Sequence, residues 1–482
     1  MTSSMIANTT SATDGAGRDH HGNPMSGTAD AIALYDRAMD RLLRFDPLAV
    51  DLAGELVEQE PEAAMAHVLV AYLHLMSTDV PDLDNVRAAR DALATLPTNA
   101  RETMHAGVIA AWLDGDWAGA ARRLDDLLQK WPTDLLALMI GHQLDFFLGD
   151  AGNLCDRPAR TISALAPEHP HAGFVRGMQS FGFEEFGLYP RAEAAGLAAL
   201  ATNPDDVWAV HAVVHTFEMQ GRIDEGIRFM QERVGDWGSG NLFTVHNWWH
   251  LALYSLEAGD RARALRIYDA EIHHAASLGV PLEMLDASAL LWRFELDGAD
   301  TGGRFAPLAD AWASRVTAEP WYVFNDLHAV MAFAGAGRLD DAKAVVRRLD
   351  TYLESASGTN ARMTAEIGRP ASRAVIAFAE GRHADVIDDL VPIRRIVNRF
   401  GGSHAQRDAV QRTLLESALR AGHHDLARAM LAERLNLRET SVYGWWQQAR
   451  LQAAIGATEA SAVATDRATA LRAGFAAALT SA

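Results

Sequence analysis

Cysteine is almost absent from this sequence, since Cys155 is the only one among 482 residues. A single thiol cannot form a disulfide within the chain, and nothing near it completes a metal–thiolate spacing. We therefore expect Cys155 to be an ordinary buried or half-buried thiol.

Basic residues are scarce relative to acidic ones, 43 against 63, and the formal net charge is −20. Such a charge repels phosphate backbones and anionic lipid, so we expect no nucleic acid partner and no membrane partner. The sequence also has no apolar run of the roughly 18 residues needed to span a bilayer. Its N-terminus has no apolar core of a secretory signal. A cytoplasmic location is the resulting expectation.

Several fingerprints of enzyme families are missing as well. The sequence contains no glycine loop for a dinucleotide or a phosphate, no G-x-S-x-G turn for a serine nucleophile and no H-E-x-x-H zinc motif. No nucleotide cofactor is therefore expected. Any function has to be argued from side chains placed by the fold.

What the sequence does contain is glycine at a nearly constant interval. Most of these glycines end an apolar run with helical spacing, and several open a short polar turn into an alanine-rich run. Glycine suits such a turn because it can adopt the left-handed conformation that ends a helix. A helix–turn–helix unit of about 34 residues is the tetratricopeptide repeat. At gaps of 34 to 44 residues, the glycines are Gly115, Gly149, Gly187, Gly221, Gly259, Gly298, Gly337, Gly381, Gly422 and Gly456.

The period predicts an all-α protein, a tetratricopeptide-like α-solenoid of stacked helical hairpins. We expect a single elongated domain over residues 29–482, because each hairpin in such an array buries its apolar side against its neighbours. Residues 1–28 are rich in Ser, Thr, Gly, Asp and His and have few large apolar groups, which predicts a disordered tail. His20 and His21 are therefore expected to have no role.

One repeat carries polar residues where the other first helices are apolar. His211, His215 and Glu218 follow the spacing i, i+4 and i+7 and form one stripe along a helix face. Glu184 and Glu295 occupy the register of Glu218 in other repeats. First helices line the concave groove of a tetratricopeptide superhelix, so the stripe is expected to face this groove.

The next repeat adds a second pair of histidines at i and i+4, His246 and His250, and His246 falls on the same stripe. An N-x-x-H pair also recurs in two repeats. Asn247 and His250 recur as Asn325 and His328, at the same distances from the glycine that ends their repeat. An equivalent helix face is expected to carry both pairs.

Two chemistries fit these histidines. A pair at i and i+4 can bind one divalent metal, with a carboxylate one turn away as a further ligand. Without a metal, imidazole oriented by a carboxylate can transfer protons near neutral pH. Each histidine could also be an ordinary hydrogen-bonded residue. The candidate catalytic residues are His211, His215, Glu218, His246 and His250, and the presence of a metal stays open.

A further polar segment, residues 401–408, lies where one long helix gives way to the next. Ser403 is a candidate helix cap there. Free backbone N–H groups at the helix start, together with Arg407, suit a carboxylate or a phosphate. The segment could equally be only a capped turn with an ion pair. With one tryptophan of the pair 248–249, the candidate substrate-binding residues are Asn247, Trp249, Asn325, His328, Ser403, His404 and Arg407.

Four runs carry a family resemblance: WAVHAVVHTFEMQGR at 208–222, HNWWHLAL at 246–253, FNDLH at 324–328 and GGSHAQRD at 401–408. In these runs the chain resembles the tetratricopeptide repeat protein 38 family, and the resemblance extends over nearly the whole chain after the tail. It implies the all-helical repeat fold and fits a shared groove site. It implies no particular reaction.

These residues predict a small-molecule enzyme or ligand-binding protein with acid–base chemistry of the hydrolase or lyase type, with or without a metal. The alternative is a non-catalytic scaffold that binds a peptide or protein partner in the groove, which the fold alone favours. A groove closed around the four histidines would favour a small molecule, and an open one a peptide. The sequence does not determine the oligomeric state.

Overall fold

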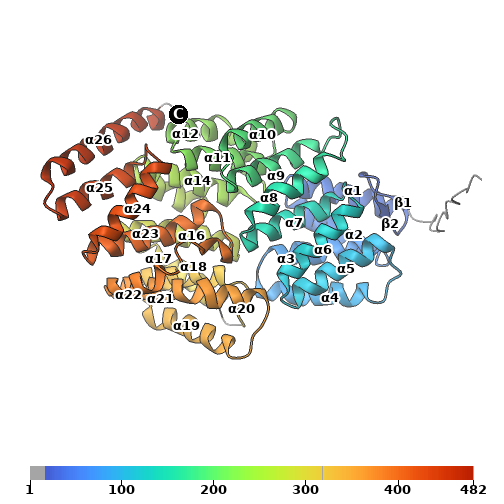
Figure 1. Ribbon diagram of the computed structural model, residues 1–482. Coiled ribbons are helices and arrows are strands. Elements are labelled where there is room, and N and C mark those ends of the chain that lie inside the picture. Colours follow the sequence, from blue (N-terminus) through green and yellow to red (C-terminus); the bar gives the residue numbers. More distant parts are fainter. Residues whose placement is uncertain (1–16, 317–318, 481–482) are drawn as a thin grey trace, which may run out of the picture.

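The structure, a computed structural model, describes residues 17–316 and 319–480, and nearly all of them are helical (Figure 1). Successive helices pack as antiparallel hairpins, which confirms the predicted all-α helical repeat fold. Two short strands pair at the start of the described chain.

The first half of the chain comprises β1 (Gly17–Arg18), β2 (Pro24–Met25), α1 (Ala29–Leu43), α2 (Leu48–Gln59), α3 (Ala64–Met76), η1 (Val80–Asp82), α4 (Leu83–Leu93), α5 (Ala100–Leu113), α6 (Trp117–Lys130), α7 (Leu135–Leu148), α8 (Ala151–Ile162), α9 (Ala172–Glu185), α10 (Tyr189–Thr202), α11 (Val207–Gln220), α12 (Ile223–Glu232) and α13 (Val234–Trp237).

The second half comprises α14 (Thr244–Glu257), α15 (Arg261–Ile267), η2 (Tyr268–Ile272), α16 (Pro281–Leu296), α17 (Phe305–Ala313), α18 (Val323–Gly335), α19 (Leu339–Leu353), α20 (Thr359–Met363), η3 (Thr364–Gly368), α21 (Arg369–Ala379), α22 (His383–Leu390), η4 (Val397–Phe400), α23 (His404–Arg420), α24 (His424–Leu437), α25 (Val442–Ala454) and α26 (Thr458–Thr480).

The periodic glycines lie in the turns of the hairpins. All ten have a left-handed backbone, with φ between 62° and 82°. Gly221, for example, ends α11 and donates its N–H to the carbonyl oxygen of Glu218 at 3.0 Å. The prediction that glycine ends the first helix of each repeat is therefore confirmed.

The array closes on itself instead of extending. Figure 1 shows the orange and red hairpins lying against the cyan, teal and green ones. Segments 219 to 249 residues apart are joined by the hydrogen bonds Asn325–Thr78, Thr359–Gly115, Asn398–Gly149, Arg407–Glu185 and Thr440–Gly221. The expectation of an elongated domain is therefore wrong. A repeat period fixes contacts between neighbours, whereas small rotations summed over many repeats decide which distant repeats meet.

The helix α23 lies in the interior of this closed array, where it packs against α16 and α11. Ser403 caps it, and the side chain of Gln406 accepts a hydrogen bond from the Ser403 backbone in return. Before the cap, Gly401 and Gly402 have φ of 87° and 76°. A Cβ on Gly401 would lie 2.5 Å from the carbonyl oxygen of Phe147, so the close approach of the chain requires glycine there.

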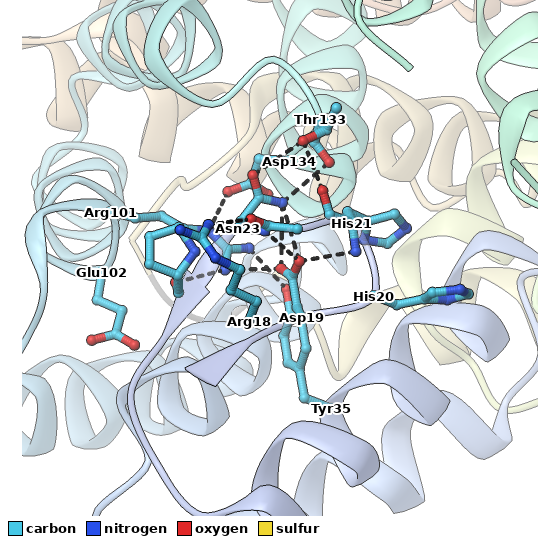
Figure 2. A network of polar contacts seen from close by, with 12 residues as sticks. Arg18, Asp19, His20, His21, Asn23, Tyr35, Arg101, Glu102, Thr133 and Asp134 are labelled. Carbon is cyan, nitrogen blue, oxygen red and sulfur yellow. Dashed lines mark hydrogen bonds and ion pairs between the residues drawn. The ribbon is translucent and has the colours of Figure 1, made fainter. Parts of the chain in front are cut away.

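The N-terminal segment is folded from residue 17, whereas residues 1–16 of the predicted tail lie outside the described residues. β1 and β2 form a hairpin, and the loop between them buries Asp19 against Arg101 at 2.9 Å (Figure 2). The prediction of disorder is therefore wrong for residues 17–28. Composition measures the apolar groups of a segment, and it cannot show an ion pair made with a distant helix.

The start of α11 gives a pH-dependent prediction. The Asp206 carboxylate caps this helix by accepting from the Ala209 N–H at 2.9 Å, while its second oxygen is buried with no partner among the described residues. Burial raises the pKa of Asp206 to about 8. A raised folded-state pKa makes the contribution of Asp206 to stability largest below pH ~4, and this contribution declines as the pH rises toward 8.

Asp206→Asn keeps the cap and removes the buried charge. We expect it to be more stable than the parent protein at pH 8, by at least ~1 kcal/mol, with a smaller difference at pH 5. Urea unfolding at both pH values measures the difference. Asp150→Asn is the matched control, because Asp150 caps α8 in the same way but is exposed. An Asp206→Asn protein less stable than the parent at pH 8 would contradict this account.

Candidate metal centre

Two neighbouring helices bring the four predicted histidines together. His211 and His215 come from α11, and His246 and His250 come from α14. One ring nitrogen of each lies within 4.8 Å of those of the other three. Three of the rings are buried, and only the His246 side chain is partly exposed, at 15%. The i, i+4 spacing in each helix accounts for this convergence.

The ring nitrogens face one another at short distances. The Nε2 of His246 lies 3.2 Å from the Nε2 of His211 and 3.2 Å from the Nε2 of His250. Two imidazole nitrogens bound to one tetrahedral metal at about 2.0–2.1 Å are ~3.3 Å apart. The observed spacing is therefore that of ligands around a single ion.

Two carboxylates fix the tautomers of this group. The Nδ1 of His246 lies 2.7 Å from Asp286, and the Nδ1 of His250 lies 3.1 Å from Glu218. A carboxylate accepts, so each Nδ1 carries the proton and each Nε2 presents a lone pair. The two lone pairs then point at each other without a proton between them, an arrangement that a bound cation would stabilise. Carboxylates in this position orient metal-binding histidines and raise their basicity.

The surroundings favour the neutral form of the three fully buried imidazoles, and neutral imidazole is the form that binds metals. Burial lowers the pKa of His211, His215 and His250 well below the ordinary histidine value. The neighbouring histidines lower each pKa further, because a second positive charge close by is unfavourable.

A second polar group adjoins His215. Its Nδ1 lies 3.6 Å from Glu184, which with Glu185 faces His404 at the start of α23. Burial and the neighbouring Glu185 raise the pKa of Glu184 to about 7. Burial would raise the pKa of Glu185 too, but Arg407 and His404 outweigh it and hold that pKa below its usual range. Burial opposes the charged form of His404, yet the two glutamates raise its pKa to about 9.

Glu218 also borders a small polar cavity of about 20 Å³, which has room for one or two water molecules. Its wall includes three arginines, Arg293, Arg412 and Arg438, and the acidic residues Glu257 and Asp408. Burial and the neighbouring Arg412 lower the pKa of Arg293 to about 10. Glu218 thus lies between the four histidines and a cavity lined by charged residues.

The structure pairs some of the predicted residues differently from the sequence analysis. Glu218 contacts His250 and not His215, and the carboxylate near His215 is Glu184, 3.6 Å from its Nδ1 and not hydrogen-bonded to it. The stripe does not face an open groove, because α23 covers this part of the concave side. Glu295 is not one of the carboxylates that hold the histidines.

The candidate substrate-binding residues are divided between three places. Trp249 stacks on His246, with ring centres 5.3 Å apart, and Asn247 beside it is buried with no hydrogen bond to its side chain among the described residues. Asn325 instead binds Thr78 where distant repeats meet, and His328 binds the carbonyl oxygen of Phe324 in its own helix.

The segment at the start of α23 serves mainly as structure. Ser403 caps the helix, as the sequence indicated, and its role in substrate binding stays a prediction. His404 and Arg407 bind the glutamates of α9. These two residues therefore lie beside the histidine cluster, next to His215, and their charges are balanced by Glu184 and Glu185.

The sequence analysis missed Asp286, which is fully buried and holds His246. The repeat register could have identified Asp286. It lies twelve residues before Gly298, as Asn247 and Asn325 lie twelve residues before Gly259 and Gly337. Glu185 was missed as well, and nothing in the repeat register distinguishes it.

The solved structures similar to this chain are similar at low sequence identity and low TM-score. No family model matches the chain. A human IFIT1 dimer with m7Gppp-AAAA is similar over 94% of this chain and 97% of that chain, at a TM-score of 0.41 and 12% identity. Yeast Tom70 is similar over 93% and 96%, at a TM-score of 0.32 and 13% identity. For Naa15/Naa10 bound to HypK the coverage is 77% and 64%, the TM-score 0.23 and the identity 12%.

Fold and site together define an all-α protein of stacked helical hairpins with a histidine-rich interior. Membership in the tetratricopeptide repeat protein 38 family stays a prediction, as do the cytoplasmic location and the absence of a nucleic acid partner. Within residues 17–316 and 319–480, no helix combines the length and the apolar character that crossing a bilayer requires.

Proposed function

We propose that this protein is a metal-dependent enzyme acting on a small molecule, with a divalent transition-metal ion held by His211, His246 and His250 and with His215 as the fourth candidate ligand. The observation that carries the proposal is the pair of Nε2 atoms 3.2 Å apart, with Asp286 and Glu218 beside the opposite nitrogen of each ring. Imidazole ligands suit Zn²⁺, Fe²⁺, Cu²⁺ and Ni²⁺.

The neighbouring groups support chemistry of the hydrolase or lyase type. A bound divalent ion would supply Lewis acidity, polarising a carbonyl or phosphoryl oxygen. Glu184 lies beside His215 and is the carboxyl group placed to hold or move a proton there. His404 lies 3.3 Å from that carboxyl and holds it in position. The burial of the histidines favours a small substrate, because a peptide could not lie along residues that α23 covers.

Metal content tests the proposal. Protein purified without chelator should lose one equivalent of metal per chain in the variants His246→Ala and His250→Ala, measured by elemental analysis. His67→Gln is the control, because His67 binds a backbone carbonyl, that of Pro61, far from the cluster in sequence. Equal metal content in the parent protein and both variants would refute a metal at this site.

Turnover of small chromogenic esters and phosphoesters tests the catalytic half. We expect Glu184→Gln to retain the metal and to lose turnover, since the amide cannot exchange a proton. A metal-loaded protein that turns over none of these compounds would count against hydrolysis but not against the metal centre. A protein with neither metal nor turnover would instead be the non-catalytic scaffold, binding a peptide or protein partner through another surface.

A further inference from the structure

A second group of histidines lies at the N-terminal end of the array. His20 and His21 occupy the loop between β1 and β2, where Figure 2 shows both side chains. His169 and His171 come from the turn that precedes α9. The two pairs are about 150 residues apart in the sequence, yet the Nε2 of His21 lies 2.9 Å from the Nδ1 of His171.

The four rings are nearly equidistant. All six distances between ring centres fall between 5.1 and 5.8 Å. Four points with equal mutual distances form a tetrahedron. Four imidazoles bound to one ion through nitrogen at about 2.0–2.1 Å would have ring centres ~5 Å apart. The ring centres therefore have the spacing of a tetrahedral site, and three of the four rings also bring a nitrogen within 4.8 Å of the others.

The donor atoms of three of the rings support this arrangement. One nitrogen from each of His21, His169 and His171 lies within 4.8 Å of the others. The Nε2 of His171 lies 3.2 Å from the Asp40 carboxylate, which fixes the proton on Nε2 and leaves Nδ1 as a lone pair facing His21. Asp40 thus orients the ring of His171 in the same way as Asp286 orients that of His246.

His169 contributes a buried nitrogen that lacks a partner. Its Nε2 makes no hydrogen bond to any described residue, and its Nδ1 lies 3.1 Å from the backbone nitrogen of His171. Because the His171 N–H donates to Nδ1, the ring proton is on Nε2, and an ion that binds through Nε2 has to displace this proton.

The loop that carries His20 and His21 is held from several sides. Asp19 accepts from the backbone N–H of His21 at 3.0 Å, and Asp36 accepts from that of His20 at 2.9 Å. Thr133 donates to the carbonyl oxygen of His21 at 2.9 Å. Three acidic residues, Asp19, Asp36 and Asp40, therefore contact the histidines or their backbone, a charge distribution that suits a cation. His20 is exposed, so an ion could enter from solvent.

We propose that His20, His21, His169 and His171 form a second metal site, one for Zn²⁺, which fastens the N-terminal hairpin to the turn before α9. Imidazole ligands suit zinc among several divalent ions, and four protein ligands around one ion leave no open position, as in a structural zinc site. This site is separate from the four-histidine centre and does not depend on the function proposed for it.

Zinc stoichiometry of the full chain tests the proposal. After removal of metals with a chelator, titration with Zn²⁺ in a calorimeter should give one binding equivalent that disappears in the double variant His21→Ala/His171→Ala. The same variant should keep the equivalent assigned to His246 and His250. His74→Ala is the control, since His74 forms a separate contact with Asp82. The control should bind as much zinc as the parent protein.

A milder variant and a protease assay test the proposal even if the double variant does not fold. His20→Ala removes an exposed side chain, and it should weaken zinc binding at this site at least about 10-fold without changing the thermal melt of the metal-free protein. Zn²⁺ should also protect the segment around residue 20 from protease in the parent protein and not in His20→Ala. The proposal is overturned if the double variant and His20→Ala bind the same number of zinc ions with the same affinity as the parent. It is overturned too if zinc leaves proteolysis of the segment unchanged.

Discussion

Asp286→Asn should weaken metal binding at the four-histidine centre about 10- to 100-fold, although Asp286 does not contact the ion itself. The carboxylate lies 2.7 Å from the Nδ1 of His246 and is fully buried. It therefore fixes the tautomer of His246 and makes its Nε2 more basic. An asparagine amide is neutral and can present its NH₂ group to the ring, so it loses both effects. Competition against a chromophoric chelator gives the apparent Kd.

Glu218→Gln should have an effect of the same kind through His250, which the Glu218 carboxylate contacts at 3.1 Å. Glu295→Gln is the matched control, because Glu295 lies on α16 with Asp286 and occupies the repeat register of Glu218. We expect its Kd to equal that of the parent protein. If Asp286→Asn binds the metal as tightly as Glu295→Gln, the carboxylate does not support the ligand and the assignment of tautomers fails.

Arg101→Met should lower the free energy of unfolding by about 3–5 kcal/mol. Arg101 is almost fully buried and contacts Asp134 at 2.6 Å and Asp19 at 2.9 Å (Figure 2). Burial would raise the pKa of Asp134, but Arg101 and His105 outweigh it and hold this pKa below the usual range. Removal of the arginine leaves two buried carboxylates without their cation. Urea unfolding at pH 7 measures the loss.

Arg87→Met is the control for this change, because Arg87 pairs with Asp84 on the surface. Surface pairs contribute about 0–1 kcal/mol, so the control should differ little from the parent protein. The destabilisation of Arg101→Met should also shrink as the pH falls below ~4, because protonation neutralises the stranded carboxylates. Equal unfolding free energies for Arg101→Met and Arg87→Met would show that the buried network contributes no more than a surface pair.

The sequence predicted the central histidine cluster because its geometry is local. Residues four apart in a helix share a face, so His211 and His215 converge whatever the rest of the chain does. The same holds for His246 and His250, and the packing of consecutive hairpins brings the two pairs together. The second histidine group could not be predicted in this way. His21 and His171 meet only because the N-terminal hairpin folds back onto the turn before α9.

By itself, then, the sequence determined the helical hairpins, their glycine turns and the stripe of histidines, because helix spacing and left-handed turns act over a few residues. Only the tertiary structure decided that the array closes and that α23 covers the histidines. It also decided that Asp286, and not Glu295, supports the cluster. The rotation from each repeat to the next adds up along the chain, and the sum depends on all the packing contacts at once.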